Sequence, residues 1–422
     1  MSTQVRANLT EEQVREISEG LDEPDWLLER RLDALDALDG LDMPDVIRTP
    51  GRSWTNLHEL DFESLVDPLN AAEEKDQVGP EEVEVLSIRE ALAEREELVR
   101  EAFGSVIDPQ ENYLTALSTA LFSTGTVVYV PEGVDAEDVT IRTRMNSRSL
   151  FNYTLVITEK SSSVTILERQ TTGDSEAQRA SGRSSGERDE PRDEVEGERY
   201  YSGLVEVDAG ENSHVQYGSL QNLSAETYDY TLKRGHADTY ATVNWIEGNF
   251  GSRLTKSSVE TRLLGEASET KIVGAFFGHG DQHFDVASRV WHEAEHTTAD
   301  LVTRGVLDDV ARSVYEGVQD VGPSAWNTSS YQRENTLMLS DESEADASPK
   351  LIINNHDTEA SHSATVGQVD AEDLFYMTSR GVDPRRARNM LVEGFFVPVL
   401  EEIDVEEFRE DLDGLVGERL RS

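Results

Sequence analysis

Cysteine is absent from this chain of 422 residues, and only six of its 38 basic residues are lysine. Without a thiol, the chain can form no disulfide, no thiolate metal site and no cysteine nucleophile of its own. No apolar run approaches the roughly 18 residues that a membrane-spanning helix requires. The first 20 residues are polar and acidic, unlike a signal peptide. These absences predict a cytoplasmic protein with no membrane-spanning segment.

Acidic residues are abundant instead. Aspartate and glutamate number 85, and the formal net charge is −47. They are spread along the whole chain, which indicates a general property of the surface rather than one acid-rich binding site. Such a surface repels itself unless counter-ions screen it. The composition is typical of the salt-rich cytoplasm of a halophile, and the same negative field disfavours nucleic-acid binding.

The N-terminal part is expected to be helical. Apolar residues recur at three- and four-residue spacing in 11–20 and 24–38, and Thr10 with Gln13 has the spacing of a capping box. Residues 86–103, rich in Glu, Ala, Leu and Arg, predict one further helix. We therefore expect a helical N-terminal domain over 1–115, a strand-rich core over 116–365 and a helical C-terminal domain over 366–422.

The strand-rich core contains a loose repeat. The form strand, polar turn, strand occurs at 155–167, 204–217, 230–243 and 259–273, and the turns recur at intervals of roughly 25 to 30 residues. One such unit cannot close a core alone, but stacking on its neighbours would bury the inward-facing side chains of a β-helix. An antiparallel sandwich would also contain many short strands, so periodicity alone leaves both folds open.

An acidic segment interrupts this core at 171–197. It has almost no large apolar side chain, so it cannot bury enough surface to offset the entropy of ordering. We interpret it as a disordered insert between two strands.

The stretch WHEAEHTTADL contains the pattern H-E-x-x-H, formed by His292, Glu293 and His296. A zinc protease needs this pattern on one helix, where both histidines can share a metal. Here the pattern occupies the repeat position of a polar turn between two strands, so solvent-exposed turn histidines are the simpler interpretation. The alternative function is a hydrolase, either a β-helix enzyme acting on polysaccharide or a zinc-dependent enzyme using the His292/His296 cluster.

Four ordered motifs mark the C-terminal part. They are PKLII at 349–353, SHSAT at 361–365, FYMTSRG at 375–381 and ARNMLVEGF at 387–395. Together they resemble the signature of the SufB/SufD family of iron–sulfur cluster assembly proteins. The chain is more similar to the SufD type, because it lacks the SufB cysteine and carries an S-H-x-A-T sequence where SufB-type chains have E-H-E-A-T.

The resemblance implies a mainly β fold, with a right-handed parallel β-helix core between helical N-terminal and C-terminal domains. It also implies a non-catalytic scaffold subunit that pairs with SufB and binds the ATP-binding-cassette ATPase SufC, and it leaves open a homodimer when the chain is alone. No Walker sequence G-x-x-x-x-G-K-[ST] occurs, so ATP hydrolysis is expected from the partner. No tightly bound cofactor is implied, only a transient iron–sulfur cluster at the interface with SufB.

His362 is the residue to which the resemblance gives a chemical role. It matches the family histidine that faces the SufB cysteine, where a neutral imidazole can ligate iron or hold a nascent cluster. Ser361 and Thr365 flank it in the S-H-x-A-T turn and are expected to orient the ring by hydrogen bonding. The alternative is a histidine that only caps a turn.

A last set of candidates lies in the C-terminal helical domain, whose implied role is ATPase binding. The candidates recur on one helical face: Leu391, Phe395, Phe396 and Leu400. Core packing and a docking stripe for SufC both predict this spacing.

Overall fold

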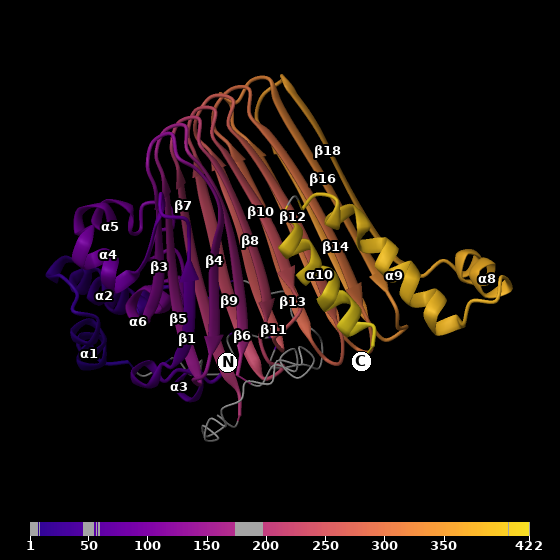
Figure 1. Cartoon of the computed structure of the whole chain (residues 1–422), viewed down its shortest axis with the longest axis horizontal. Coiled ribbons are helices and arrows are strands. Elements are labelled where there is room, and N and C mark those ends of the chain that lie inside the picture. Colours follow the sequence, from indigo (N-terminus) through magenta and orange to yellow (C-terminus); the bar gives the residue numbers. More distant parts are fainter. Residues whose placement is uncertain are drawn as a thin grey trace.

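Two nine-stranded sheets face each other along the molecule and form one parallel β-solenoid (Figure 1). The computed structural model describes residues 7, 9–44, 55, 57, 60–173, 197–403 and 405–421. From β3 onwards, successive strands alternate between the sheets, so that each coil contributes one strand to each sheet. The expected mainly β, parallel β-helix fold with helices at both ends is confirmed.

The strands of the two sheets have the following bounds. The first sheet contains β1 (Glu73–Val78), β4 (Asp135–Met145), β6 (Ser163–Thr172), β8 (His214–Asn222), β10 (Thr242–Asn249), β12 (Glu269–Gly278), β14 (Thr298–Leu307), β16 (Thr328–Met338) and β18 (Thr358–Gln368). The second sheet contains β2 (Glu84–Ser87), β3 (Thr124–Val130), β5 (Ser149–Thr158), β7 (Arg199–Ala209), β9 (Thr227–Ala237), β11 (Leu254–Leu263), β13 (His283–His292), β15 (Arg312–Val321) and β17 (Glu344–Ile353).

The coils stack in register. Tyr217 pairs with Trp245, Trp245 with Ile272, and Ile272 with Leu301, all in parallel strands. This spacing confirms the expected coil length. All four side chains are almost completely buried between the sheets, and burying an apolar side chain of this size stabilises a fold by roughly 1.5–3 kcal/mol.

The two ends of the solenoid differ. At the N-terminal end, β1 pairs with β4 and β2 pairs with β3, both antiparallel to the parallel stack. The N-terminal helices gather at the same end (Figure 1). They are α1 (Glu11–Leu21), α2 (Asp25–Ala37), α3 (Phe62–Leu65), α4 (Ile88–Glu94), α5 (Glu96–Ala102) and α6 (Tyr113–Leu121), with short 3₁₀ turns η1 (Leu38–Gly40) and η4 (Pro68–Asn70). At the other end, the stack stops at β17 and β18.

The capping box predicted at Thr10 and Gln13 is present at the start of α1. The single helix predicted over 86–103 is wrong. Its first residues belong to β2, and Arg95, with φ −136° and ψ 36°, separates α4 from α5. The apolar spacing favoured a helix there, but pairing of β2 with β3 satisfies the backbone of the first turn instead.

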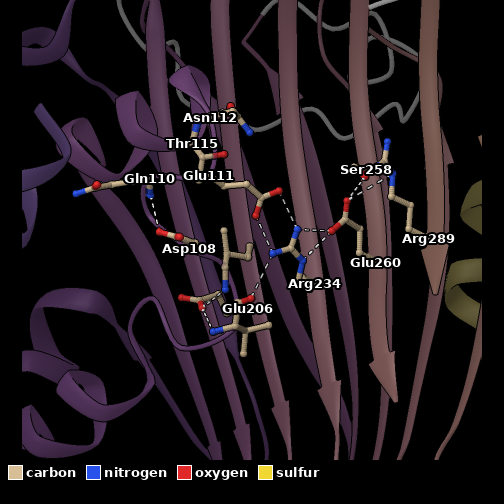
Figure 2. Close-up of polar contacts among 12 residues, drawn as sticks. Asp108, Gln110, Glu111, Asn112, Thr115, Glu206, Arg234, Ser258, Glu260 and Arg289 are labelled. Atoms are coloured by element: carbon tan, nitrogen blue, oxygen red, sulfur yellow. Dashed lines mark hydrogen bonds and ion pairs between the residues drawn. The ribbon is translucent and has the colours of Figure 1, made fainter. Parts of the chain in front are cut away.

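The buried side chains of Glu206 and Arg234 fix the segment before α6 to the second sheet (Figure 2). Glu206 in β7 accepts hydrogen bonds from the backbone N–H groups of Gly104, Val106 and Ile107 at 2.7–2.8 Å, and from the Tyr153 hydroxyl at 2.5 Å. A few residues further on, Glu111 and the buried Glu260 both pair with Arg234 of β9, at 2.8 and 2.5 Å. The helical segment is therefore bonded to the solenoid as well as packed on it.

The C-terminal helices cover the outer face of the first sheet (Figure 1). Phe408 and Leu412 of α10 (Glu406–Arg419) lie over Gly218 and Gly248, where a Cβ atom would meet their side chains. Phe396 of α9 (Pro384–Leu400) stacks on Phe277 with ring centroids 6.5 Å apart. The remaining helix, α8 (Ala371–Ser379), precedes α9 and buries no residue.

The expected segment boundaries lie close to element ends. Position 115 falls inside α6, and β18 continues to Gln368, three residues beyond position 365. Of the expected insert at 171–197, Thr171 and Thr172 belong to β6. Residues 174–196 lie outside the described part of the chain. No helix in the described ranges is long and apolar enough to cross a membrane.

Candidate functional site

The open end of the solenoid is the most unusual surface of the molecule. Strands β17 and β18 each pair on one side, with β15 and β16, and within the described residues no strand pairs on their other side. Ile352, Ile353 and Val366 on these strands are 41–45% exposed. A long edge strand with exposed apolar side chains is a ready site for pairing with another chain.

His362 lies in the middle of β18 and is exposed. The expectation that SHSAT forms a turn is wrong, because all five residues belong to this strand. His362 pairs in register with Gln332 of β16, whose side chain is buried between the sheets against Gly317. Residues in register on parallel strands share a face, so His362 points to the inner side of the solenoid, where no further coil covers it.

Ser361 and Thr365 cannot orient the His362 ring as expected. Side chains alternate along a strand, so positions one and three residues away lie on the opposite face. The nearest residues on the inner face on either side of His362 are Ala360 and Ala364. Small neighbours of this kind leave space around the imidazole in the mouth, the name we give to the inner faces of β17 and β18.

Beneath the mouth, several side chains inside the coil formed by β15 and β16 are polar. Glu334 of β16 is 1% exposed, and burial raises the pKa of its carboxyl group to about 7, although a hydrogen bond from Thr336 opposes the shift. Burial likewise raises the pKa of the Tyr315 phenol on the facing strand β15. Ser288, Thr303 and other nearby side chains lower it by hydrogen bonding, and Glu334 adds to the increase. Sequence reasoning missed this group, because polar residues on a buried strand carry no motif.

The H-E-x-x-H pattern does not form a metal site of the protease kind. His292 is the last residue of β13 and is fully buried, with Nδ1 2.8 Å from the Thr297 hydroxyl. His296 lies in the following turn at φ 62°, exposed, and contacts Asn327. The helix that would bring the two rings to one face is not formed. The expected turn is correct for His296 but wrong for His292, whose ring points inward with the strand.

Burial gives His292 a testable signature. Its folded-state pKa is lowered to about 4, mainly by desolvation of the charged ring. The unfolded chain takes up this proton near pH 6.5. Stability from the neutral ring is therefore present above pH 6.5 and is lost as the pH falls towards 4, by about 3 kcal/mol.

Replacing His292 with glutamine should remove that pH-dependent contribution. Denaturant unfolding of both proteins between pH 7.5 and pH 4 is expected to show the wild type losing about 3 kcal/mol relative to H292Q. Titration of the other histidines cancels in the difference. Parallel stability curves would contradict the buried neutral ring, as would stoichiometric zinc in the purified protein.

The four residues of α9 that were predicted to bind the ATPase differ in how deeply they are buried. Phe396 and its neighbours pack on the first sheet, and Phe396 is 1% exposed, so it has no surface to offer a partner. Phe395 is partly covered and lies beneath the guanidinium of Arg304, 4.7 Å from the ring centroid. Leu391 and Leu400 are half-buried. For Phe396 the regular spacing reflects core packing.

The exposed aromatic side chains of the C-terminal region lie on α8 instead. Phe375 is 73% and Tyr376 60% exposed, and both belong to the FYMTSRG motif. Arg380, the C-cap of the helix, lies over the Tyr376 ring at 5.2 Å, and Gly381 follows with φ 91°. This Arg–Gly pair ends the helix. Sequence reasoning placed these aromatics in the family signature but assigned them no contact role.

No group of three or more His, Asp or Glu side chains that could hold a metal ion occurs in the described ranges. The mouth contributes one imidazole and, below it, one carboxyl group. A complete ligand set at this end would need side chains from a second protein.

Comparison with known proteins agrees with this architecture. Residues 141–395 match the family model "SUF system FeS cluster assembly, SufBD core domain", and residues 59–141 match "SufBD protein N-terminal region". The chain belongs to the SufBD family. Among its relatives are the iron–sulfur cluster assembly protein SufD of Bacillus subtilis, 28% identical over the full length of both chains, and a SufBD family protein of Staphylococcus epidermidis, 28% identical over 94% of this chain and 90% of the relative.

The SufBD core match covers the parts that form the candidate site. It begins in β4 and ends in α9, and so includes the mouth and the exposed helix α8. The SufBD N-terminal match covers β1, β2 and helices α3 to α6. Helix α10, which packs on the first sheet, lies beyond both matched regions.

Proposed function

We propose that the chain is a SufD-like scaffold subunit for iron–sulfur cluster assembly, which pairs through its open end with a SufB-like subunit and binds a SufC-like ABC ATPase. The observation that carries the proposal is the mouth, where a single exposed histidine lies on the inner face of an unpaired edge strand. Membership of the SufBD family supports the assembly role. The subunit itself is non-catalytic in this proposal.

The missing thiol explains why a partner is needed. Iron–sulfur clusters are held chiefly by cysteine thiolates, and this chain has no cysteine. A subunit with His362 but no thiol can take part in building a cluster only if the other ligands come from a second chain. The cluster would then sit at the interface transiently, as the product of the complex rather than as a resident cofactor.

The edge strands offer a route to that pairing. Strand β18 is eleven residues long and presents the backbone hydrogen-bonding groups of alternate residues at its free edge, with Val366 exposed on the inner face. On β17, Pro349 removes one backbone donor from the other edge. Pairing should therefore depend mainly on β18, and a second copy of the chain could use the same edge when no partner is present.

The ATPase would bind the helical segment 366–422. Phe375 and Tyr376 project from a helix that buries none of its residues, and exposed aromatic side chains of this kind are enriched at protein interfaces. The less covered parts of Leu391, Phe395 and Leu400 could extend this surface along α9. Phe396 is excluded from it by burial.

We also propose that the complex works at high salt. With 85 acidic and only 38 basic residues the net charge is −47, so screening of the self-repulsion by salt should favour the compact state. The experiments below are therefore designed for buffers containing molar KCl.

The test is affinity isolation of the tagged chain from the organism that encodes it, combined with replacement of His362 by alanine. The wild type is expected to recover an ABC ATPase and a cysteine-bearing relative of the SufBD family. The H362A variant should recover both proteins, because the ring is exposed and its removal should leave the fold of the chain intact. Activity of iron–sulfur enzymes in the cell should nevertheless fall by about tenfold or more, as expected for loss of a metal ligand.

Matched variants separate the site from the fold. Replacing His356, an exposed histidine in the turn before β18, with alanine should leave both readouts unchanged. A Val366→Glu change should abolish recovery of the relative, whereas Leu264→Glu in a distant exposed turn should not. Failure of the wild type to recover either partner would refute the scaffold role. Full enzyme activity in H362A would remove only the histidine from the chemistry.

A further inference from the structure

One buried carboxylate near the open end, that of Glu334, has a hydrogen-bond partner for only one of its two oxygens. Glu334 Oε1 accepts a hydrogen bond from Thr336 at 2.5 Å, but Oε2 is buried and has no hydrogen-bond partner. A buried carboxylate is costly unless it is paired or protonated. Glu168 of β6 and Glu247 of β10 also each have one buried oxygen without a hydrogen-bond partner, but both lie in coils far from the open end. Glu247 forms an ion pair with Lys233 at 2.6 Å, and Glu168 accepts from the Tyr217 hydroxyl at 2.9 Å.

The position of Glu334 relates it to His362. Glu334 pairs in register with Ala364, and Gln332 pairs with His362, so Glu334 lies one strand down and two residues along from the histidine. Neighbouring strands are about 4.8 Å apart and two residues span about 6.6 Å, which separates the two Cα atoms by about 8 Å. Both side chains point to the inner side of the solenoid. The residue directly above Glu334 is an alanine, which leaves its carboxylate close to the mouth.

This arrangement matches the chemistry of a divalent metal. Carboxylate oxygen and imidazole nitrogen together suit iron, cobalt, manganese and zinc in the divalent state. A long acidic side chain and a histidine on the same face at this separation can both reach one ion. Two protein ligands are too few for a closed site, which agrees with an end that must be completed by another chain.

We propose that Glu334 is the second metal-binding side chain of the mouth, and that Glu334 and His362 together receive ferrous iron during cluster assembly, with the remaining ligands supplied by the partner subunit. This inference rests on the proposed function, because iron enters the site as a substrate of assembly. Glu334 thereby makes the mouth a two-ligand site on this chain, and its free oxygen Oε2 is the atom that binds the ion.

Cobalt(II) is the probe for ferrous iron, since its visible absorption reports an ordered ligand set while ions loosely held by the acidic surface contribute little. Titrations are made anaerobically in molar KCl, on the complex isolated with its partners and on the purified chain. The wild type is expected to saturate with one ion per chain. Glu334→Gln and His362→Ala should each weaken binding about tenfold or more. Glu334→Asp keeps the charge on a shorter side chain, so it should bind cobalt more weakly than the wild type but more tightly than E334Q.

The control is Glu359→Gln. Glu359 is an exposed carboxylate three residues before His362 on β18, and so lies on the outer face of the same strand. It should leave cobalt binding unchanged. Unaltered binding in folded E334Q, or equal loss in E359Q, would overturn the proposal. Recovery of the partners with E334Q is scored separately. A failure of the assembly role therefore shows as missing partners, and a failure of the metal site shows as unaltered cobalt binding.

Discussion

Replacing Gly251 with alanine is expected to cost about 4 kcal/mol or more of folding stability, among the largest effects that a single methyl group can have. Gly251 lies in the turn between β10 and β11, pressed against the turn of the preceding coil. A Cβ atom there would lie 2.2 Å from the backbone nitrogen of Leu223 and 2.3 Å from its carbonyl oxygen. Since both atoms belong to backbone, no side-chain rotation can relieve the overlap.

The coil cannot simply move away to make room. The Gly251 N–H donates to Gln221 Oε1 at 2.8 Å, and Gln221 Nε2 donates to the Ser252 hydroxyl at 2.7 Å. A shift large enough to accommodate a methyl group would therefore break buried hydrogen bonds, which are costly to leave unsatisfied. Guanidinium unfolding in molar KCl, followed by circular dichroism, measures the loss.

Gly394→Ala is the matched control for this change. Gly394 is in the interior of α9, and a Cβ atom there would have no neighbour within 4 Å. Alanine favours a helix over glycine by up to about 1 kcal/mol, so the control should be slightly more stable than the wild type. Equal stability of G251A and G394A would show that the turns of adjacent coils are not in close contact.

Replacing Glu206 with glutamine is expected to cost about 2 to 3 kcal/mol, because a buried N–H donor left without an acceptor costs about 1–3 kcal/mol and the remaining hydrogen bonds lose their charged acceptor. The carboxylate accepts four hydrogen bonds, three from the backbone N–H groups of Gly104, Val106 and Ile107 and one from the Tyr153 hydroxyl. An amide presents two N–H donors where one oxygen stood. At least one backbone N–H would then face another donor and lose its acceptor, whereas the Tyr153 hydroxyl can turn and accept.

Local unfolding of E206Q should begin at the backbone segment that donates hydrogen bonds to the Glu206 carboxylate. Hydrogen exchange at the amides of Val106 and Ile107 should speed up before the rest of the solenoid opens, because both donate to Glu206 Oε2. The control is Glu211→Gln in the turn after β7, an exposed glutamate paired with Lys160. It should change stability by less than about 1 kcal/mol. Similar stability of E206Q and E211Q would contradict the role of Glu206 in fastening the N-terminal segment.

The architecture was largely readable from local pattern. Short β-branched runs separated by polar turns at a steady interval indicated either stacked coils or an antiparallel sandwich, and the resemblance to the SufB/SufD family favoured the coils. The prediction of one helix over 86–103 failed because a contact between distant parts of the chain overrode the local pattern. Helical spacing was present, but the pairing of Glu84–Ser87 with β3 outweighed it, and such a partner from a distant part of the chain is invisible to local pattern.

The site was only partly predictable. His362 could be named because a family motif surrounds it, yet its strand was taken for a turn. The turn was taken over with the family motif, whereas the segment is an edge strand that carries polar residues on both faces. For His292 the error was the opposite one: the residue was predicted to lie in an exposed turn, but it is the buried last residue of β13. Glu334 carried no motif, and only the coil register could have revealed it.

Sequence by itself determined the composition of the protein and the length of its repeat. It excluded any thiol of the chain's own, predicted stacked strands and marked the C-terminal motifs. Only the tertiary structure decided which side chains meet. In a solenoid, residues about one coil apart become neighbours across strands, so His362 comes to lie over the coil of Glu334 through stacking register alone. The same stacking buries Phe396 and leaves Phe375 exposed, because packing against the sheet, rather than helical spacing, determines which face of a helix is covered.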